Sequence, residues 1–273
     1  GDNGAAFAAF SRMNEAVAAE PSQPVARAAR YRSMMRARLT SVTDVWKASW
    51  QAGPIPPERP SPVFLVGFPR SGTTLLDTML MGHLGAAVME EKPVLNAVSR
   101  EIGGFEAIAS LDGQAVRDAQ NRYFADAARV GADLARKVLI DKNPLHMMQV
   151  PLIHRLFPDA RFILALRHPA DVILSCYCTN FRPMPSLANF LRLDTAAEFY
   201  DLAFAMWERS RECMEIDVHA VVYEQLVDNP ELQLRTLAEF LGLEWRNDML
   251  DHQKTAGSRG TITTASYAQV TEP

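Results

Sequence analysis

Five short apolar runs dominate the chain from residue 63 onward, and longer stretches with apolar residues at helical spacing separate them. Short runs rich in Val, Ile and Leu are typical of buried strands. The predicted strands are Val63–Val66, Ala86–Met89, Lys137–Ile140, Arg161–Leu166 and Val218–Val222. Because strands that alternate with helices favour a parallel sheet covered on both faces, we expect an α/β domain.

The first 50 residues have a different pattern. Ala5, Phe7, Phe10, Met13 and Val17 recur near helical spacing, and two prolines precede a second helical stretch. This pattern predicts a helical lead-in over residues 1–50. The small residues near its start resemble the second helix of a tetratricopeptide unit, so we expect it to be the end of a repeat array in a longer protein.

Residues 51–62 carry five prolines and cannot form a helix or a central strand. They predict a linker, with the catalytic domain over residues 63–273.

The composition narrows the class of protein. With 273 residues, 48% of them hydrophobic and 22% charged, the chain can bury a full α/β core. A net charge of −4 argues against nonspecific nucleic-acid binding. The chain lacks a long apolar run and a signal-peptide pattern, so we expect no membrane span and a cytoplasmic location. Three cysteines give no disulfide framework and only a weak metal signal.

The loop after the first predicted strand has the spacing of a phosphate-binding Walker A loop, Gly-x-x-x-x-Gly from Gly67 to Gly72. Such a loop holds phosphate on backbone N–H groups at a helix N-terminus, which predicts a P-loop-type sheet. Thr73 stands where kinases and nucleotide triphosphatases carry the Lys that reaches the β- and γ-phosphates. The loop is therefore poorly suited to phosphoryl transfer, although Arg70 offers a planar guanidinium.

The other strand ends bring further polar side chains to the same edge of the sheet. In such sheets, ligands bind beyond the carboxyl ends of the strands. The polar side chains at these ends are Arg70, Glu91, Lys142, Arg167 and Tyr223. Three cations beside the loop amides suit a ligand with phosphates at two ends. Asp141, the only candidate Mg²⁺ anchor, is followed directly by a lysine, so we expect a metal-free transfer to a hydroxyl.

These residues resemble the sulfotransferase superfamily, which uses 3′-phosphoadenosine 5′-phosphosulfate as donor. Phe68 to Thr74 is similar to that family's 5′-phosphosulfate loop, and Arg167 with Ser175 is similar to its 3′-phosphate site. Within the superfamily, the chain is most similar to tyrosylprotein sulfotransferases and to bacterial sulfotransferases fused to tetratricopeptide repeats. Further matching segments, over residues 62–273, are Glu90-Glu91, Lys142-Asn-Pro, Tyr223-Glu-Gln-Leu-Val and Ser266-Tyr-Ala-Gln-Val.

The resemblance implies a role for each matching residue. Glu91 would be the base that takes the acceptor proton, with Glu90 as the alternative. The residues implied to bind the 5′-phosphate are Ser71, Gly72, Thr73 and Thr74; those for the 3′-phosphate and ribose region are Arg167, Ser175 and Tyr223; those around the transferring sulfuryl group are Arg70, Lys142 and Ser266.

Two departures from the family pattern limit what the resemblance implies. Pro93 stands where tyrosylprotein sulfotransferases have an arginine near the acceptor, so a peptide acceptor does not follow. The family also continues beyond the equivalent of Pro273, so we expect a further C-terminal segment with cofactor contacts.

The resulting hypothesis is a sulfotransferase that uses 3′-phosphoadenosine 5′-phosphosulfate, no metal, and in-line displacement by a hydroxyl of a peptide tyrosine, a sugar, a lipid or a small molecule. Two alternatives stay open: a P-loop kinase-like phosphotransferase, and a non-catalytic interaction module with a vestigial nucleotide site. His146, His154 and His168 are interpreted as structural, because no local pattern supports a catalytic histidine.

Overall fold

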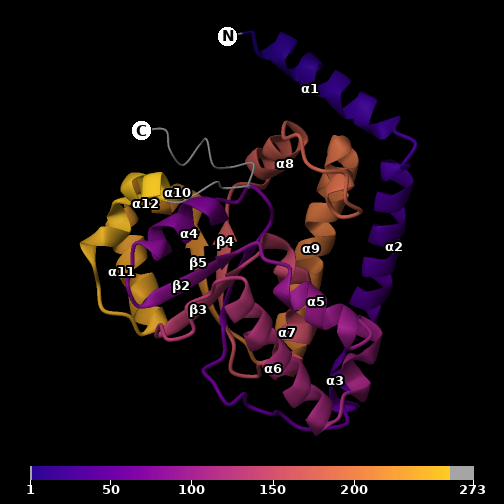
Figure 1. The fold of residues 1–273 in the computed structure, drawn as a ribbon. Coiled ribbons are helices and arrows are strands. Elements are labelled where there is room, and N and C mark those ends of the chain that lie inside the picture. Colours follow the sequence, from indigo (N-terminus) through magenta and orange to yellow (C-terminus); the bar gives the residue numbers. More distant parts are fainter. Residues whose placement is uncertain (1, 259–273) are drawn as a thin grey trace.

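The computed structural model describes residues 2–258, and its centre is a five-stranded parallel sheet with the strand order β2-β3-β1-β4-β5. Helices lie on both faces of this sheet (Figure 1). The strands are β1 (Val63–Gly67), β2 (Ala86–Glu90), β3 (Val138–Lys142), β4 (Arg161–Leu166) and β5 (Asp217–Val222). The predicted α/β fold class is therefore confirmed.

Helices occupy most of the remaining described chain. The α-helices are α1 (Asn3–Ala18), α2 (Pro24–Ser41), α3 (Asp44–Ala48), α4 (Thr73–Met81), α5 (Val94–Glu101), α6 (Gly113–Arg129), α7 (Val150–Leu156), α8 (Pro169–Tyr177), α9 (Leu193–Cys213), α10 (Tyr223–Asp228), α11 (Pro230–Leu241) and α12 (His252–Ser258). Short 3-10 helices are η1 (Phe105–Ser110), η2 (Pro144–Met148), η3 (Leu187–Leu191) and η4 (Asn247–Leu250).

Alternate residues of β1 enter two different cores. Val63 and Leu65 join the apolar cluster under α4 and α11, whereas Phe64 and Val66 join the cluster under α6, α7 and α9. This alternation follows from the strand period of two, which points successive side chains to opposite faces. All five residues of β1 are buried, as expected for the central strand of a covered parallel sheet.

The third strand ends two residues later than predicted. The pattern placed its end at Ile140, but β3 continues through Asp141 and Lys142, which pair with Phe64 and Leu65 of β1. Burying a charged residue in a strand is costly unless the residue is paired and hydrogen-bonded. Here both are buried and have partners, so the ladder continues.

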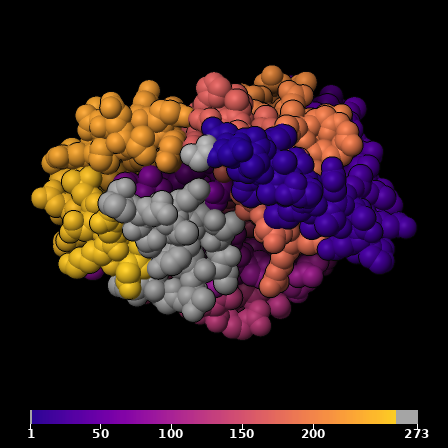
Figure 2. Space-filling view, turned by 90° about the horizontal axis from the view of Figure 1, so that it is seen from above, coloured from indigo at the N-terminus to yellow at the C-terminus, as the bar shows by residue number. Residues whose placement is uncertain are grey.

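The N-terminal lead-in is helical, as predicted, and α2 begins at Pro24, a residue suited to the first turn of a helix. Helix α2 packs along α9 and η3. Helix α1 lies against α8: Asn14 is buried and its Nδ2 donates to the carbonyl of Tyr177, 2.9 Å away. Figure 2 shows the indigo N-terminal helix lying across this part of the surface. The proposed repeat array, the linker and the domain boundaries stay predictions.

No helix in residues 2–258 combines the length and hydropathy that a bilayer crossing requires.

Candidate active site

The loop between β1 and α4 is held in a conformation that requires glycine at one position. Gly72 has φ of 93°, and a Cβ there would lie 2.5 Å from Cδ2 of Tyr223. Glycine alone tolerates both the left-handed backbone and the contact. Tyr223, at the start of α10, is thereby brought against the loop, as the strand-end pattern predicted for one shared edge.

The loop presents polar groups that the described protein atoms leave unsatisfied. Ser71 is 2% exposed, and its Oγ has no hydrogen-bond partner among residues 2–258. Thr73 and Thr74 open α4, and the first N–H groups of a helix have no partner within the helix. A helix N-terminus with such groups favours an anion.

Two arginines, a serine and a tyrosine form a cluster beside the loop. Nε of Arg70 donates to Oγ of Ser175 at 3.0 Å, and Arg167 donates to the carbonyl of Arg70 at 3.4 Å. The guanidinium of Arg167 lies over the ring of Tyr223, 4.5 Å from its centroid. Residues that follow β1, β4 and β5 thus meet Ser175 of α8 in one positively charged cluster.

The charges in this cluster are partly desolvated. Burial lowers the pKa of Arg70 from its ordinary value, and the neighbouring Arg167 lowers it further. Nε of Arg167 is buried without a hydrogen-bond partner among the described residues. Two adjacent guanidiniums repel each other, so an anion bound between them would be stabilised.

Lys142 lies in a second cluster, fully buried among three carboxylates. Its Nζ is 2.8 Å from Glu91, 3.2 Å from Asp77 and 3.3 Å from Glu90. Burial alone would lower the pKa of Lys142, but the three carboxylates outweigh burial and raise it. Nζ donates hydrogen bonds to Glu90 and Glu91, and its contact with Asp77 is an ion pair.

Glu91 is held in an unusual backbone conformation next to this cluster. Its φ is 47°, and its N–H donates to the carbonyl of Lys142 at 2.7 Å. Arg70, with φ of 72°, is another of the three non-glycine residues in the left-handed region within residues 2–258. Strained backbone of this kind concentrates at functional sites.

Asp141 precedes Lys142 in β3, so its side chain points to the opposite face of the sheet. It is fully buried and accepts a hydrogen bond from the hydroxyl of Tyr123 at 2.8 Å. Nδ1 of His146 lies 3.8 Å from the same carboxyl group. Burial raises the pKa of Asp141 to about 7 and lowers that of His146 to about 3. These residues belong to the core, and among the described residues no group of three or more His, Cys, Asp or Glu is placed to hold a metal.

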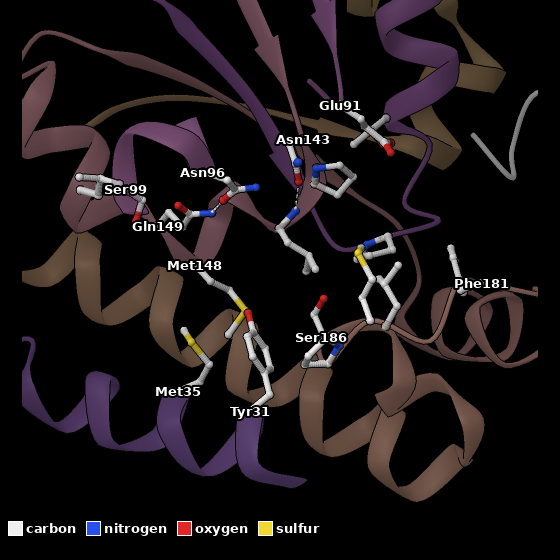
Figure 3. A pocket seen from close by; sticks show the side chains of 18 of the residues that line it. Tyr31, Met35, Glu91, Asn96, Ser99, Asn143, Met148, Gln149, Phe181 and Ser186 are labelled. Carbon is white, nitrogen blue, oxygen red and sulfur yellow. Dashed lines mark hydrogen bonds between the residues drawn. The ribbon is translucent and has the colours of Figure 1, made fainter. Parts of the chain in front are cut away.

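A cavity of about 830 Å³ opens beside both clusters. The loop contributes Arg70, Thr73 and Thr74 to its wall, and Glu91 lines it as well. Glu91 has a side chain that is 42% exposed, whereas Glu90 is 15% exposed and does not line the cavity. Figure 3 shows Glu91 at one end of this space and Tyr31, on α2, at the other.

The structure therefore gathers the predicted residues into two neighbouring groups. The group at the loop contains Arg70, Ser71, Gly72, Thr73, Thr74, Arg167, Ser175 and Tyr223. The second contains Glu90, Glu91 and Lys142. Ser266 lies outside the described residues.

The sequence pattern does not single out Asp77 or the cavity residues on α2. Asp77 is fully buried in α4, and a lone carboxylate within the apolar segment Thr73–Met81 is the signal that could have identified it. No comparable signal marks Tyr31 and Met35, because their positions in α2 look like ordinary packing.

This chain is similar in sequence to known sulfotransferases. The model of the sulfotransferase family matches residues 62–247. Protein-tyrosine sulfotransferase 2 of Gallus gallus is 26% identical over 227 residues, covering 77% of this chain and 58% of that protein. Nodulation protein NoeE of Sinorhizobium fredii is 29% identical over 212 residues, covering 66% of this chain and 50% of that protein. This chain thus spans half to three fifths of the length of these relatives.

A solved structure shares the fold. The sulfotransferase domain from the curacin biosynthetic pathway superposes with a TM-score of 0.54 at 23% identity, covering 78% of this chain and 83% of that one.

Proposed function

This chain belongs to the sulfotransferase family, and from that premise we propose that it transfers a sulfuryl group from 3′-phosphoadenosine 5′-phosphosulfate to a hydroxyl group. One observation carries the proposal: the anion-binding loop and the carboxylate of Glu91 border the same cavity. A donor on the loop and an acceptor beside Glu91 would therefore meet within it.

The donor side has the groups that a nucleotide with two phosphate positions needs. Residues 71–74 offer the Ser71 hydroxyl and the free N–H groups of the first turn of α4 to the 5′-phosphosulfate. Arg167 and Ser175 are proposed to bind the 3′-phosphate, with Tyr223 beside the ribose. The unsatisfied Ser71 Oγ and Arg167 Nε support this fit, because buried polar atoms are normally hydrogen-bonded.

The acceptor side has one exposed carboxylate. We assign the base to Glu91 rather than Glu90, because only Glu91 lines the cavity. The acceptor oxygen forms a bond to sulfur while the bond between sulfur and the phosphate oxygen breaks. The hydroxyl proton passes to Glu91, and the electron pair leaves on the phosphate oxygen of 3′,5′-adenosine bisphosphate. Arg70 lies where it can stabilise that developing charge.

Lys142 contributes by holding Glu91. Its ammonium binds the Glu91 carboxylate at 2.8 Å, and Glu91 lines the cavity. The family resemblance implies that Lys142 donates a hydrogen bond to the leaving oxygen. For that, Nζ would have to release one of its carboxylates and bind the phosphosulfate instead.

Thermal unfolding with nucleotides tests the donor. A ligand that binds only the folded chain raises its apparent stability. We expect 3′,5′-adenosine bisphosphate to raise the Tm and ATP with Mg²⁺ to leave it unchanged. Stabilisation by ATP–Mg²⁺ with no effect of the bisphosphate would instead favour the phosphotransferase alternative.

Replacement of the two adjacent glutamates tests the base. Glu91→Gln should lower kcat by about 10²- to 10⁴-fold, the usual contribution of a positioned base, with the bisphosphate Kd unchanged. Glu90→Gln is the matched control, since it also contacts Lys142 but does not line the cavity. A large loss of kcat in Glu90→Gln and a small one in Glu91→Gln would reverse the assignment.

Binding of the bisphosphate without turnover by the unaltered chain would favour the interaction module.

A further inference from the structure

The cavity is larger than the transferring group requires and extends away from the loop. Its volume of about 830 Å³ lies in the range of pockets that bind whole small molecules. Glu91 and Asn143 lie at one end, while Tyr31 and Met35 of α2 lie at the other (Figure 3). We propose that the acceptor is a phenol or alcohol whose hydroxyl is carried on an extended, mainly apolar body; this inference rests on the proposed function.

The far part of the cavity is separate from the nucleotide side. Arg167, Ser175 and Tyr223 do not line it, and the loop borders it only through Pro69, Arg70, Thr73 and Thr74. A donor held by the loop would therefore leave the volume between Glu91 and α2 for a second substrate. That volume is where the body of the acceptor must lie.

The walls of this volume are mainly apolar. Met35, Ile108 and Met148 are each less than 5% exposed, and the rings of Phe105 and Phe181 also contribute to the wall. Thioether side chains are flexible and adapt to irregular apolar shapes. Such walls gain free energy when an apolar ligand leaves water.

Two groups of polar side chains in these walls already have partners. Nε2 of Gln149 donates to Oδ1 of Asn96 at 2.9 Å, as drawn in Figure 3. Arg38 binds Glu106 through three contacts of 3.1–3.3 Å. A charged group of the acceptor that reached these paired side chains would lose its hydration without an equivalent partner.

A peptide tyrosine fits this cavity less well than an apolar phenol. A peptide brings a backbone N–H and C=O for every residue, and buried groups of this kind need hydrogen bonds. Asn96, Gln149 and Arg38, which already have partners, do not supply them. The family arginine near the acceptor is also replaced by Pro93.

A series of 4-alkylphenols tests the inference in the unaltered chain. With 3′-phosphoadenosine 5′-phosphosulfate as donor, we expect kcat/KM to rise about threefold to fourfold for each added methylene until the alkyl substituent is long enough to reach α2. The affinity of each phenol for the protein saturated with 3′,5′-adenosine bisphosphate should rise in parallel. A tyrosine hexapeptide should be a poorer acceptor than 4-hexylphenol by about 100-fold.

Two adjacent methionines on α2 give a matched pair of variants. Met35 is 3% exposed and lines the cavity, whereas Met34 is 37% exposed and does not. Met35→Trp should abolish the dependence on alkyl length while 4-ethylphenol is still turned over, and Met34→Trp should keep the dependence.

The outcomes separate the two levels of the proposal. If small phenols are turned over but neither rate nor affinity depends on alkyl length, the inference of an apolar acceptor is wrong and the proposed function stands. A preference for the tyrosine hexapeptide would have the same meaning. Failure of every acceptor, together with no binding of the bisphosphate, overturns the proposed function and this inference with it.

Discussion

At the scale of single residues, Lys142 and Asp77 form an ion pair 3.2 Å long in which both side chains are fully buried. A charge at such a position is tolerated only because opposite charges compensate the lost hydration. Glu90 and Glu91 share the compensation, so Lys142 remains paired when one carboxylate is removed.

This arrangement predicts the effect of neutralising Asp77. Asp77→Asn should lower the free energy of unfolding at pH 7 by about 1–3 kcal/mol, less than the full cost of breaking an isolated buried pair. Urea unfolding measures the change. Asp201→Asn is the control, because Asp201 lies exposed on α9. Equal effects of the two replacements would show that the Lys142 cluster contributes nothing to stability.

Asp141 predicts a specific dependence of stability on pH. Burial raises its pKa to about 7, although the Tyr123 hydroxyl offsets part of the effect. In the unfolded chain, the carboxyl group ionises near pH 4. Between about pH 4 and pH 7 the folded chain holds a proton that the unfolded chain has released, so the Asp141 contribution to stability falls as pH rises.

The Asp141 contribution has to be isolated by comparing two proteins, because His146 changes the free energy of unfolding with pH in the opposite direction. Burial lowers the pKa of His146 to about 3, so its contribution rises with pH between about 3 and 6.5. The free energy of unfolding of the unaltered chain minus that of Asp141→Asn should therefore decrease by more than about 1 kcal/mol between pH 4 and pH 7. A difference that stays constant over this range would contradict the raised pKa.

At the scale of elements, the turn from β1 into α4 depends on its contact with α10. The left-handed backbone at Gly72 and the ring of Tyr223 leave no room for a side chain. Because Tyr223 also lies under the Arg167 guanidinium, displacement of the ring would disturb the proposed 3′-phosphate site.

Two glycines with the same backbone angle allow the cost of backbone strain to be measured apart from the cost of a steric contact. Gly72 and Gly131 both have φ of 93°, but a Cβ at Gly131 would meet no atom within 4 Å. Gly131→Ala should cost about 1–2 kcal/mol of stability from backbone strain alone. Gly72→Ala should cost more and should also weaken bisphosphate binding, as calorimetry can measure. Equal stability losses with unchanged binding would rule out the Tyr223 contact as the reason for glycine.

At the scale of the whole molecule, the N-terminal helices pack against the elements that carry the candidate site. Helix α2 forms one end of the cavity, and α1 is tied to α8, the helix that carries Ser175. The hydroxyl of Tyr177 also donates to Ser11 at 2.8 Å, and Phe7 stacks on the Tyr177 ring.

Removing one of these ties should loosen α1. Asn14→Ala deletes the buried hydrogen bond to the Tyr177 carbonyl and should cost about 1–2 kcal/mol. Amide hydrogen exchange in α1 should then accelerate, while exchange in β1 should change less. Glu15→Ala, at an exposed position of the same helix, is the control. Unchanged exchange in α1 would indicate that the other contacts hold it by themselves.

The sequence by itself determined the sheet and the loop. Buried strands need apolar residues and an anion-binding loop needs glycine at fixed places, so Val63–Val66 and Gly67–Gly72 carry local signals. Only the tertiary structure decided how the charges pair and which residues line the cavity. Asp77 and Lys142 are 65 residues apart, and Tyr31 is 60 residues from Glu91. Such contacts depend on how helices pack over the sheet, which the local pattern of apolar residues does not specify.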